Sequence, residues 1–467
     1  MKSRKTETLR RFHKIPQVRF KEDRRLTSYG GLVIFQVLFR HLALKARVRH
    51  CFRHIDRQGI YGLGNIFVVL IVHLLLGFRR LRGLDYYKND PMASRVCGLS
   101  CLPDASTVSR NLERADATSV DELRNLLKEM TLFRLKDDNI GRVTVDFDGS
   151  VQSTKGHAEG TAVGFNKQKK GARSYYPLFA TVSQVGQFFD MHHRSGNVHD
   201  SNGAPEFIAK TLLEIRRELP RVILECRIDS AFYNQTVFNV LEQCHAEFSC
   251  SVPFERLPDL KKAVEQCHSW DDIDDRWSCC ESTWTPKSWN KAYRLIFVRQ
   301  RKRPQRKGPM PLQLDLFIPT DSEYEYKVIA TNKTGSARSV ILFHNGRGSQ
   351  EKIFGEGKQH AALDYIATRR LIGNQVFTLA GMFAHNLTRE LQMSTYEKER
   401  GTLPKRPPLW ELQSLGTIRQ HLLHSAGELT RPQGELTLTM NANEAFQRDI
   451  IHYLVSLGAE GVINEAA

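Results

Sequence analysis

The stretch Val143-Thr-Val-Asp-Phe-Asp-Gly-Ser-Val151 determines the fold class of this chain. Its apolar and polar residues alternate, which is the two-residue period of a β-strand with one face in a core. Asp146 and Asp148 therefore point to the same side of this strand, close to its end at Gly149. A carboxylate at a strand end beside a turn can hold a divalent metal ion, so these two aspartates must be considered together with later carboxylates.

The composition indicates a large, basic protein. The chain has 467 residues, 41% of them hydrophobic, which is enough for about two to four domains with cores of their own. Its 68 Lys and Arg residues outnumber 51 Asp and Glu, giving a formal net charge of +17. A protein this large and this basic usually binds a polyanion, most often nucleic acid. A basic enzyme without such a partner is the alternative.

The cysteines and the apolar runs favour a reduced cytoplasmic protein. The nine cysteines include only two close pairs, Cys97 with Cys101 and Cys279 with Cys280, and neither has the doubled spacing of a zinc site. We therefore expect free thiols. The longest apolar run, residues 66–78, is shorter than the about 20 residues of a membrane span and is expected to be a buried helix. The charged N-terminus lacks the apolar segment of a signal peptide.

The N-terminal third is predicted to contact DNA through an arm and a helical domain. Residues 1–25 are rich in Lys and Arg and form either an arm along a DNA backbone or a solvated tail. Residues 26–140 have helical periodicity, notably over 32–47 and 66–79, and a capping box at Ser119 and Glu122 predicts another helix start. A short helix over 102–114 carries Arg110 and Arg114. This pattern is typical of helix-turn-helix DNA readers and also of plain helical bundles.

The rest of the chain is predicted to be an α/β sheet interrupted by an insertion. Residues 141–245 follow the order strand, strand, strand, helix, strand, helix, and the fourth strand ends on Asp229. Residues 246–330 hold four of the five tryptophans and a basic segment with Arg301, Lys302 and Arg303, which predicts a β-rich insertion with a cationic loop. Residues 331–393 return to helix, and 394–467 form a C-terminal region with a Pro-rich segment, a strand and a final helix.

Asp148, Asp229 and Glu351 are the candidate catalytic carboxylates. The first two stand at predicted strand ends and the third on a following helix. Three converging carboxylates repel one another unless a cation neutralises them. Oxygen ligands with few His or Cys indicate Mg²⁺ or Mn²⁺, and two such ions about 4 Å apart support in-line displacement at phosphorus. In so basic a protein, the substrate is expected to be a DNA phosphodiester.

The carboxylates resemble those of DDE transposases of bacterial insertion sequences, in particular insertion sequence family 1380 or a close relative, from about residue 26 to near the C-terminus. In such enzymes the first carboxylate ends the first strand and precedes small residues. Asp148, which precedes Gly149 and Ser150, fits best, and Asp146 is the alternative. The second ends the fourth strand, as Asp229 does here.

The third carboxylate of these enzymes lies in a signature of Tyr, two residues, Arg, three residues, Glu, six residues, Lys. His344, Arg347, Glu351 and Lys358 have this spacing, with His in the place of Tyr. On a single helix the Arg, Glu and Lys would share one face, although two intervening glycines predict a bend before Lys358.

The resemblance implies a fold, a reaction and partners. The fold is an RNase H-like mixed α/β core interrupted by a β-rich insertion and preceded by a helical DNA-binding domain. The reaction is cleavage of double-stranded DNA at terminal inverted repeats and joining of the 3′-hydroxyls to target DNA, directly or through hairpin ends. A homodimer on the bacterial nucleoid would bring two ends together. Asp148, Asp229 and Glu351, with Asp146 nearby, would hold two Mg²⁺ or Mn²⁺ ions; His344, Arg347 and Lys358 would contact DNA, and Trp284 or Trp289 would hold an extruded base.

Other assignments of the same residues remain. The active site could belong to an RNase H-like nuclease without strand transfer, or the chain could be a catalytically silent DNA-binding relative. A cluster of His192, His193 and His199 is not expected to bind metal, because adjacent residues of a strand point to opposite faces. Glu356 is expected to be solvated, and Asp190 to lack cationic partners.

Overall fold

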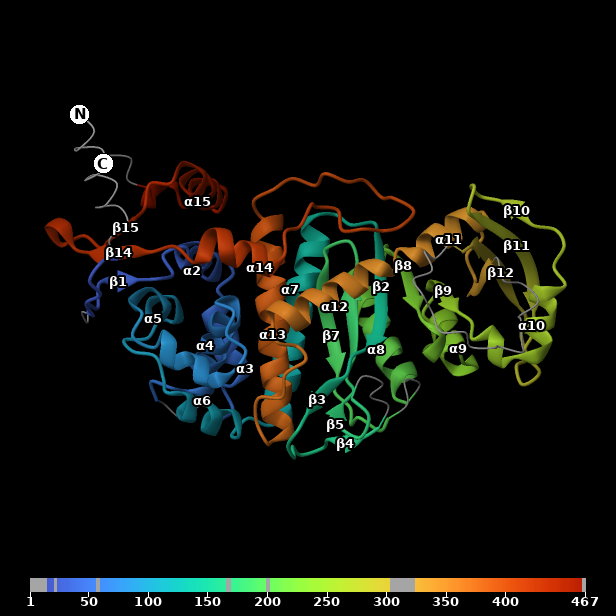
Figure 1. Ribbon diagram of the computed structural model, residues 1–467, viewed down its shortest axis with the longest axis horizontal. Coiled ribbons are helices and arrows are strands. Elements are labelled where there is room, and N and C mark those ends of the chain that lie inside the picture. Colours follow the sequence, from blue (N-terminus) through green and yellow to red (C-terminus); the bar gives the residue numbers. More distant parts are fainter. Residues whose placement is uncertain are drawn as a thin grey trace.

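Helices at one end, a sheet in the middle and further strands at the other end make up an elongated molecule (Figure 1). The computed structural model describes residues 15–20, 23–55, 59–164, 169–198, 202–302 and 324–463. Arg303, His199 and most of the basic arm over 1–25 lie outside the described residues.

The N-terminal region is helical, as predicted. The helix expected over 32–47 is divided in two, because Ala43 has a left-handed φ of 48°. The apolar run forms a buried helix that packs on the long helix α13 (Leu371–Met393), with the rings of Phe67 and Phe383 5.3 Å apart. The helices of this region are α2 (Leu32–His41), α3 (Leu44–Cys51), α4 (Leu63–Leu75), α5 (Pro91–Cys97), α6 (Ala105–Leu112) and α7 (Ala117–Asp137).

Helix α7 begins before the predicted capping box. Asp116 is its N-cap, and the Asp116 carboxylate accepts a hydrogen bond of 2.8 Å from the backbone N–H of Ser119. The prediction of a start at Ser119 is therefore wrong. An aspartate three residues upstream already satisfies the amide groups that the box would have capped.

A nine-stranded mixed sheet forms the centre, in the order β10-β11-β12-β13-β9-β8-β2-β6-β7. Strand β2 pairs in parallel with β8 and antiparallel with β6, and β8 pairs in parallel with β9. The predicted order of strands and helices over 141–245 is confirmed, with three short strands added in a small separate sheet. The elements are β2 (Arg142–Gly149), β3 (Gln152–Thr154), β4 (Ala162–Val163), β5 (Arg173–Tyr175), β6 (Leu178–Val182), β7 (Gln187–His192), α8 (Ala204–Glu218), β8 (Ile223–Ile228), α9 (Gln235–Gln243) and β9 (Glu247–Ser251).

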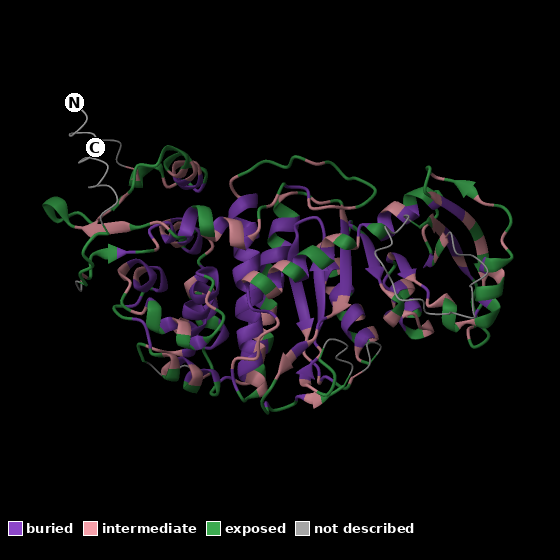
Figure 2. Cartoon of the chain, viewed as in Figure 1, coloured by how far each residue is buried: buried purple, intermediate pink, exposed green. Residues whose placement is uncertain are grey.

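The two faces of this sheet differ in chemistry. Val143, Val145 and Phe147 of β2 are buried in one apolar core with residues of α8 and α9. The alternate residues of β2 and β8 point to the other face and are polar: Thr144, Asp146 and Asp148, and Glu225 and Arg227. Figure 2 shows the sheet as the buried centre of the molecule. The candidate site therefore belongs to a polar sheet face that is largely buried.

Helix α13 joins the helical region to the sheet. Nearly all of its residues are buried, and it lies between α4 on one side and β7 and α7 on the other (Figure 1). On the polar face of the sheet the chain forms α11 (Ala337–Asn345) and α12 (Gly348–His360), and Figure 1 shows α12 crossing in front of the strands. A long segment over 396–414 then passes over one end of the sheet (Figure 1).

The predicted insertion is rich in strands, but these strands extend the central sheet. Strand β13 pairs with β9 of the core, and β12 and β11 follow outward. Arg299 and Arg301 lie in β12 and not in the expected cationic loop, because cross-strand pairing continues through Arg301. These elements are α10 (Pro258–Glu265), β10 (Asp271–Asp272), β11 (Trp277–Trp284), β12 (Tyr293–Arg301) and β13 (Tyr324–Thr331).

The C-terminal region returns to the helical end of the molecule. Strand β14 (Gly427–Thr430) pairs with β1 (Leu26–Thr27) and β15 (Thr437–Met440), and α15 (Glu444–Ser456) follows. In the described part of the chain, no helix is long and apolar enough to span a membrane. All nine cysteines are free thiols, as expected.

Candidate active site

Asp148 and Asp229 lie at the ends of two neighbouring parallel strands. Asp146 of β2 is the register partner of Arg227 of the parallel strand β8, and Asp148 and Asp229 each follow two residues later, where these strands end. Neighbouring strands are about 4.8 Å apart, so the two half-buried carboxylates share one edge and one face. Asp229 also caps the short 3₁₀ helix Ser230–Phe232, because its carboxylate accepts a hydrogen bond of 2.9 Å from the N–H of Ala231.

Glu351 lies in the first turn of α12, with its side chain exposed. Arg347 is the N-cap residue of this helix, and its Nη1 is 3.5 Å from a carboxylate oxygen of Asp229. This ion pair connects the helix that carries the third carboxylate to the strand that carries the second. Among the described residues, no three His, Cys, Asp or Glu side chains lie close enough together to hold a metal ion. Asp148 and Asp229 thus follow neighbouring strands, and the ion pair of Arg347 with Asp229 links the second of them to the start of α12.

Polar atoms next to these carboxylates in the chain lack partners. Ser150 Oγ and both polar side-chain atoms of Gln350 are buried without a hydrogen bond to another described residue. Gln350, with 1% exposure, directly precedes Glu351. Buried polar groups are normally satisfied by protein, water or ions. Together with the hard oxygen donors of Asp148 and Asp229, these atoms fit a site for a hydrated divalent cation or a phosphate.

Asp146 has a different environment from Asp148. Its two oxygens accept hydrogen bonds of 2.5 and 2.6 Å from Nε and Nη2 of Arg227, and both side chains are fully buried. Burial is the largest influence on Asp146 and raises its pKa, whereas the charge of Arg227 opposes that rise. A neutral Asp146 would leave the buried guanidinium unpaired, so the pair stays ionised at neutral pH. This geometry favours Asp148 over Asp146 as the first metal ligand.

His344 is an internal residue of α11. Its two ring nitrogens are each 2.9 Å from a serine hydroxyl of β9, Ser249 and Ser251, and the side chain is buried. Burial, followed by the positive charges of Arg347 and Arg227, lowers the pKa of His344 to about 3. The ring is therefore neutral and holds α11 against the sheet. The predicted contact of His344 with DNA stays a prediction.

The predicted signature does not lie on one helix. α11 ends at Asn345 and α12 begins at Gly348, so His344 and Glu351 belong to different helices and Arg347 lies at the junction. Conversely, the expected bend before Lys358 is absent, because α12 is continuous to His360. Gly357 is buried against Leu363 and Phe188, which supports the helix where its propensity is low. Lys358 is half-buried, with its Nζ 6.0 Å from the ring centroid of Phe354.

Two further carboxylates have partners that the sequence did not reveal. Glu356 is not solvated: it pairs with Arg389 and, at 3.4 Å, with His385 of α13. Burial alone would raise the pKa of Glu356, but the charges and hydrogen bonds of its partners lower it to about 2. Asp190 is likewise not without a cation, since both its oxygens accept hydrogen bonds of 2.7 and 2.9 Å from Arg124 of α7.

A charged network lies on the same sheet face. Glu225 of β8 is fully buried and accepts hydrogen bonds from Thr144, Arg142, Lys333 and Arg406. Burial alone would raise the pKa of Glu225, but the hydrogen bonds and charges of Arg406 and Lys333 lower it to about 2. The network attaches the segment over 396–414 to strands β2 and β8, which both lead to candidate carboxylates.

The family of the chain follows from its comparison with known proteins. The model of the family described as Transposase DDE domain group 1 matches residues 12–459. The chain belongs to this family. No curated protein matches it. Among solved structures, a piggyBac transposase synaptic complex with hairpin DNA is 10% identical, with 94% of this chain and 86% of that chain covered and a TM-score of 0.41. A Mos1 transposase paired-end complex with the left transposon end is 10% identical, with 53% and 66% covered and a TM-score of 0.17.

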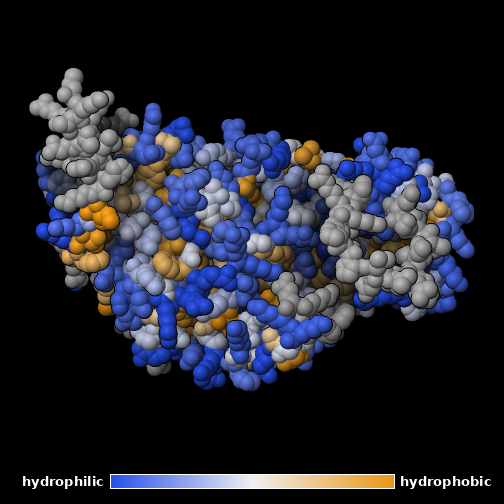
Figure 3. Space-filling view, in the orientation of Figure 1, coloured by the Kyte–Doolittle hydropathy of each residue, from blue (hydrophilic) through white to orange (hydrophobic). Residues whose placement is uncertain are grey.

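The transposase carries the cations predicted to bind DNA on several separate elements. Arg110 of α6 and Arg114, just after the end of this helix, are exposed, and they make local hydrogen bonds with Ser106, Thr107 and Asn111. Arg301 and Lys302, at the end of β12, are also exposed. The visible face of the molecule is mainly hydrophilic, with hydrophobic side chains in small scattered groups (Figure 3).

One cationic surface of the transposase was missed from its sequence. Arg24, Lys88 and Arg95 line a hollow of about 540 Å³ beside α5, together with neutral polar side chains and no carboxylate. Lys88 also pairs with Asp104 at 2.9 Å. The three cations lie between 7 and 71 residues apart in the chain, so only the fold brings them together.

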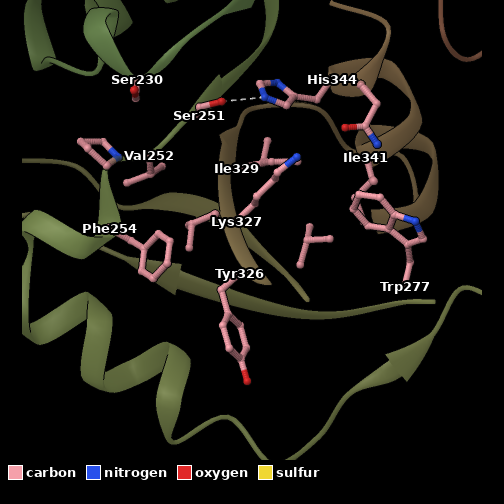
Figure 4. A pocket seen from close by; sticks show the side chains of 14 residues that line it. Ser230, Ser251, Val252, Phe254, Trp277, Tyr326, Lys327, Ile329, Ile341 and His344 are labelled. Atoms are coloured by element: carbon pink, nitrogen blue, oxygen red, sulfur yellow. Dashed lines mark hydrogen bonds between the residues drawn. The ribbon is translucent and has the colours of Figure 1, made fainter. Parts of the chain in front are cut away.

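The predicted base-holding tryptophans pack against the protein. Trp289 stacks on Tyr233 at 4.9 Å and contacts Phe238 at 5.2 Å, and Trp284 is half-buried against the same core. A different, mainly apolar pocket of about 230 Å³ is lined in part by Ser230, the residue that follows Asp229 in the chain. Figure 4 shows its lining from several elements. The lining includes Phe254, Trp277, Tyr326, Lys327 and His344.

Proposed function

We propose that this member of the DDE transposase family is an insertion-sequence transposase, related to insertion sequence family 1380, that cleaves the ends of its element and joins them to target DNA. The observation that carries the proposal is the position of Asp148 and Asp229, each two residues after the register partners Asp146 and Arg227 of neighbouring parallel strands, in a chain that belongs to this family. The net charge of +17 supports a DNA substrate. The mixed sheet with helices on both faces supports an RNase H-like core.

Asp148, Asp229 and Glu351 would hold two Mg²⁺ or Mn²⁺ ions. Oxygen donors, the proximity of the first two carboxylates and the unpartnered polar atoms around them fit such ions. When bound, the ions would activate the attacking oxygen and stabilise the leaving oxygen at phosphorus. Glu351 must approach the strand edge for this arrangement, either by a change of rotamer or with a small movement of α12.

The cations of the site have separate roles in the proposal. Arg347 neutralises part of the charge on Asp229 and lies where a phosphate would approach the strand edge. Lys358 follows two turns after Glu351 on the same continuous helix and would bind the DNA backbone further away. His344 would act indirectly, by holding the end of α11 on β9 and so fixing the position of Arg347.

An extruded base would enter the pocket of Figure 4 rather than stack on Trp284 or Trp289. Trp277, Tyr326 and Phe254 offer apolar and aromatic surface there, Lys327 offers a positive charge, and Ser230, the chain neighbour of Asp229, also lines the pocket. Extruding a base costs a few kcal/mol, which stacking on an aromatic ring offsets in part. Hairpin formation at the cleaved end would be one use of such a pocket.

The remaining assignments describe how the element's ends are recognised. Residues 26–140 would read the terminal inverted repeat, with Arg110 and Arg114 and the hollow lined by Arg24, Lys88 and Arg95 as backbone contacts. The arm over 1–25 and the insertion with Arg301, Lys302 and Arg303 would add further contacts. Two copies of the chain would pair the ends in a synaptic complex on the bacterial nucleoid.

The experiment is end mapping on a DNA fragment that contains the sequences flanking the gene. Purified protein, wild type or Asp229→Asn, is incubated with this fragment and Mg²⁺, and new 3′-ends and joined products are sequenced. Metal-dependent cuts at an inverted repeat, absent with Asp229→Asn and followed by joining, are the expected result. Cuts without joining would indicate a nuclease, and binding to the repeat without cuts would indicate a silent relative.

A further inference from the structure

A single buried guanidinium on β8 contacts β2 and the end of α11, the helix that directly precedes the helix of Glu351. Arg227 and Asp146 are register partners on β8 and β2, and each stands two residues before a candidate ligand, Asp229 and Asp148 respectively. Their bidentate contact has donor–acceptor distances of 2.5 and 2.6 Å. Because the side-chain period of a strand is two, a slip of one strand by one residue would turn its ligand to the face opposite the other ligand.

The same guanidinium also contacts the end of α11, close to the junction with α12. Nη1 of Arg227 donates hydrogen bonds to the main-chain oxygens of Phe343 (3.4 Å) and Lys405 (2.8 Å), and its Cζ lies 5.5 Å from the Phe343 ring centroid. Phe343 is in the last turn of α11, four residues before Arg347. Nη2 also donates to Ser183 Oγ at 2.9 Å. All five N–H groups of a guanidinium lie in one plane, so these contacts fix its orientation closely.

We infer that Arg227 is a positioning residue that sets the distances among Asp148, Asp229 and Glu351, an inference that rests on the proposed function of these carboxylates. It is not a catalytic residue, since it is fully buried. A buried ion pair adds little net stability compared with apolar side chains of similar size. The contacts of Arg227 instead fix the register of β2 against β8 and the position of the end of α11. A site assembled from three separate elements requires that these positions be fixed.

Arg227→Lys tests the inference, because lysine keeps the charge and loses the planar, bidentate contact. Arg124→Lys is the matched control: Arg124 makes the same Nε and Nη2 contacts with Asp190, away from the carboxylates. Asp146→Asn is a milder second variant that keeps the shape of the side chain. Binding of Mn²⁺ to the full-length protein without DNA is measured by calorimetry and electron paramagnetic resonance, and end cleavage is measured separately.

The expected result is Mn²⁺ binding at least about tenfold weaker in Arg227→Lys, as for other residues that orient metal ligands, with a smaller loss in Asp146→Asn and none in Arg124→Lys. Binding of DNA should stay within about twofold of wild type, because no DNA contact is removed. If Arg227→Lys does not fold, the Mn²⁺ affinity of Asp146→Asn tests the inference. Unchanged Mn²⁺ affinity in the folded variants, an equal loss in Arg124→Lys, or no Mn²⁺ binding by the wild type would overturn the inference. Absence of cleavage by a wild-type protein that binds Mn²⁺ would instead contradict the proposed function.

Discussion

Gly346, at the junction of α11 and α12, is expected to tolerate no side chain. Its φ of −60° suits any residue, so backbone conformation is not the obstacle. A Cβ at this position would lie 1.9 Å from the carbonyl oxygen of Lys405 and 2.2 Å from Nη1 of Arg227. To reach an ordinary contact near 3.4 Å, the Lys405 backbone would have to move by about 1.5 Å. That movement would break its hydrogen bond with Arg227.

The cost of Gly346→Ala follows from these two effects. Added volume in a packed interior costs about 1–3 kcal/mol, and losing a hydrogen bond from a charged group costs about 1.5–3 kcal/mol. The helix propensity of alanine returns at most about 1 kcal/mol. We therefore expect a loss of about 2–5 kcal/mol in the free energy of unfolding. Gly355→Ala is the matched control: Gly355 lies in the following helix α12, nothing is within 4 Å of its Cβ position, and the substitution should gain about 0.5–1 kcal/mol.

Urea unfolding followed by tryptophan fluorescence and circular dichroism measures both variants, and hydrogen exchange locates the change. The exchange of amides in α11, the start of α12 and the segment around Lys405 should increase in Gly346→Ala and not in Gly355→Ala. Equal stability of the two variants would refute the reasoning. It would mean that the Lys405 carbonyl does not lie against Gly346 in solution.

Three further outcomes are expected. Glu225→Gln should destabilise the protein by roughly 3 kcal/mol at neutral pH; since the folded-state pKa near 2 lies below the ordinary 4.5, the difference from wild type should shrink as pH falls from about 4.5 towards 2 in unfolding titrations. Arg24→Ala combined with Arg95→Ala should make the slope of log affinity for DNA against log salt about 2 units shallower, whereas Arg217→Ala on α8 should not change it in binding titrations. Glu351→Gln should keep DNA binding and lose metal-dependent cleavage by at least about a hundredfold in end-mapping assays, and equal activity would remove Glu351 from the site.

The parts of the fold that were predictable depend on local periodicity. The order of strands and helices expected over 141–245 is the order found, and strand β2 was expected from the alternation of apolar and polar residues. The same alternation placed Asp146 and Asp148 on one face but could not choose between them. The choice depends on Arg227, a residue 81 positions away that pairs with Asp146 across the sheet.

The failed predictions share this dependence on distant partners. Glu356 appeared to be a solvated helical residue, but Arg389 and His385 reach it from α13, a helix that follows in the chain and folds back. Asp190 was expected to lack cationic partners, yet both its oxygens accept hydrogen bonds from Arg124 of α7. Such partners are tens of residues away, and periodicity within a short window carries no information about them.

The spacing of the signature residues predicted one helical face, but the structure places these residues differently. A spacing of four residues between Arg347 and Glu351 suggested one helical face, whereas the helix begins between them and Arg347 turns towards Asp229. The junction exists because Gly346 lets α11 end directly against Arg227 and Lys405. Two aspartates at neighbouring strand ends repel each other, and Arg347 offsets part of that repulsion in the protein without metal. The residues that set the geometry of the third carboxylate are therefore Arg227, Gly346 and Arg347, none of which is a carboxylate.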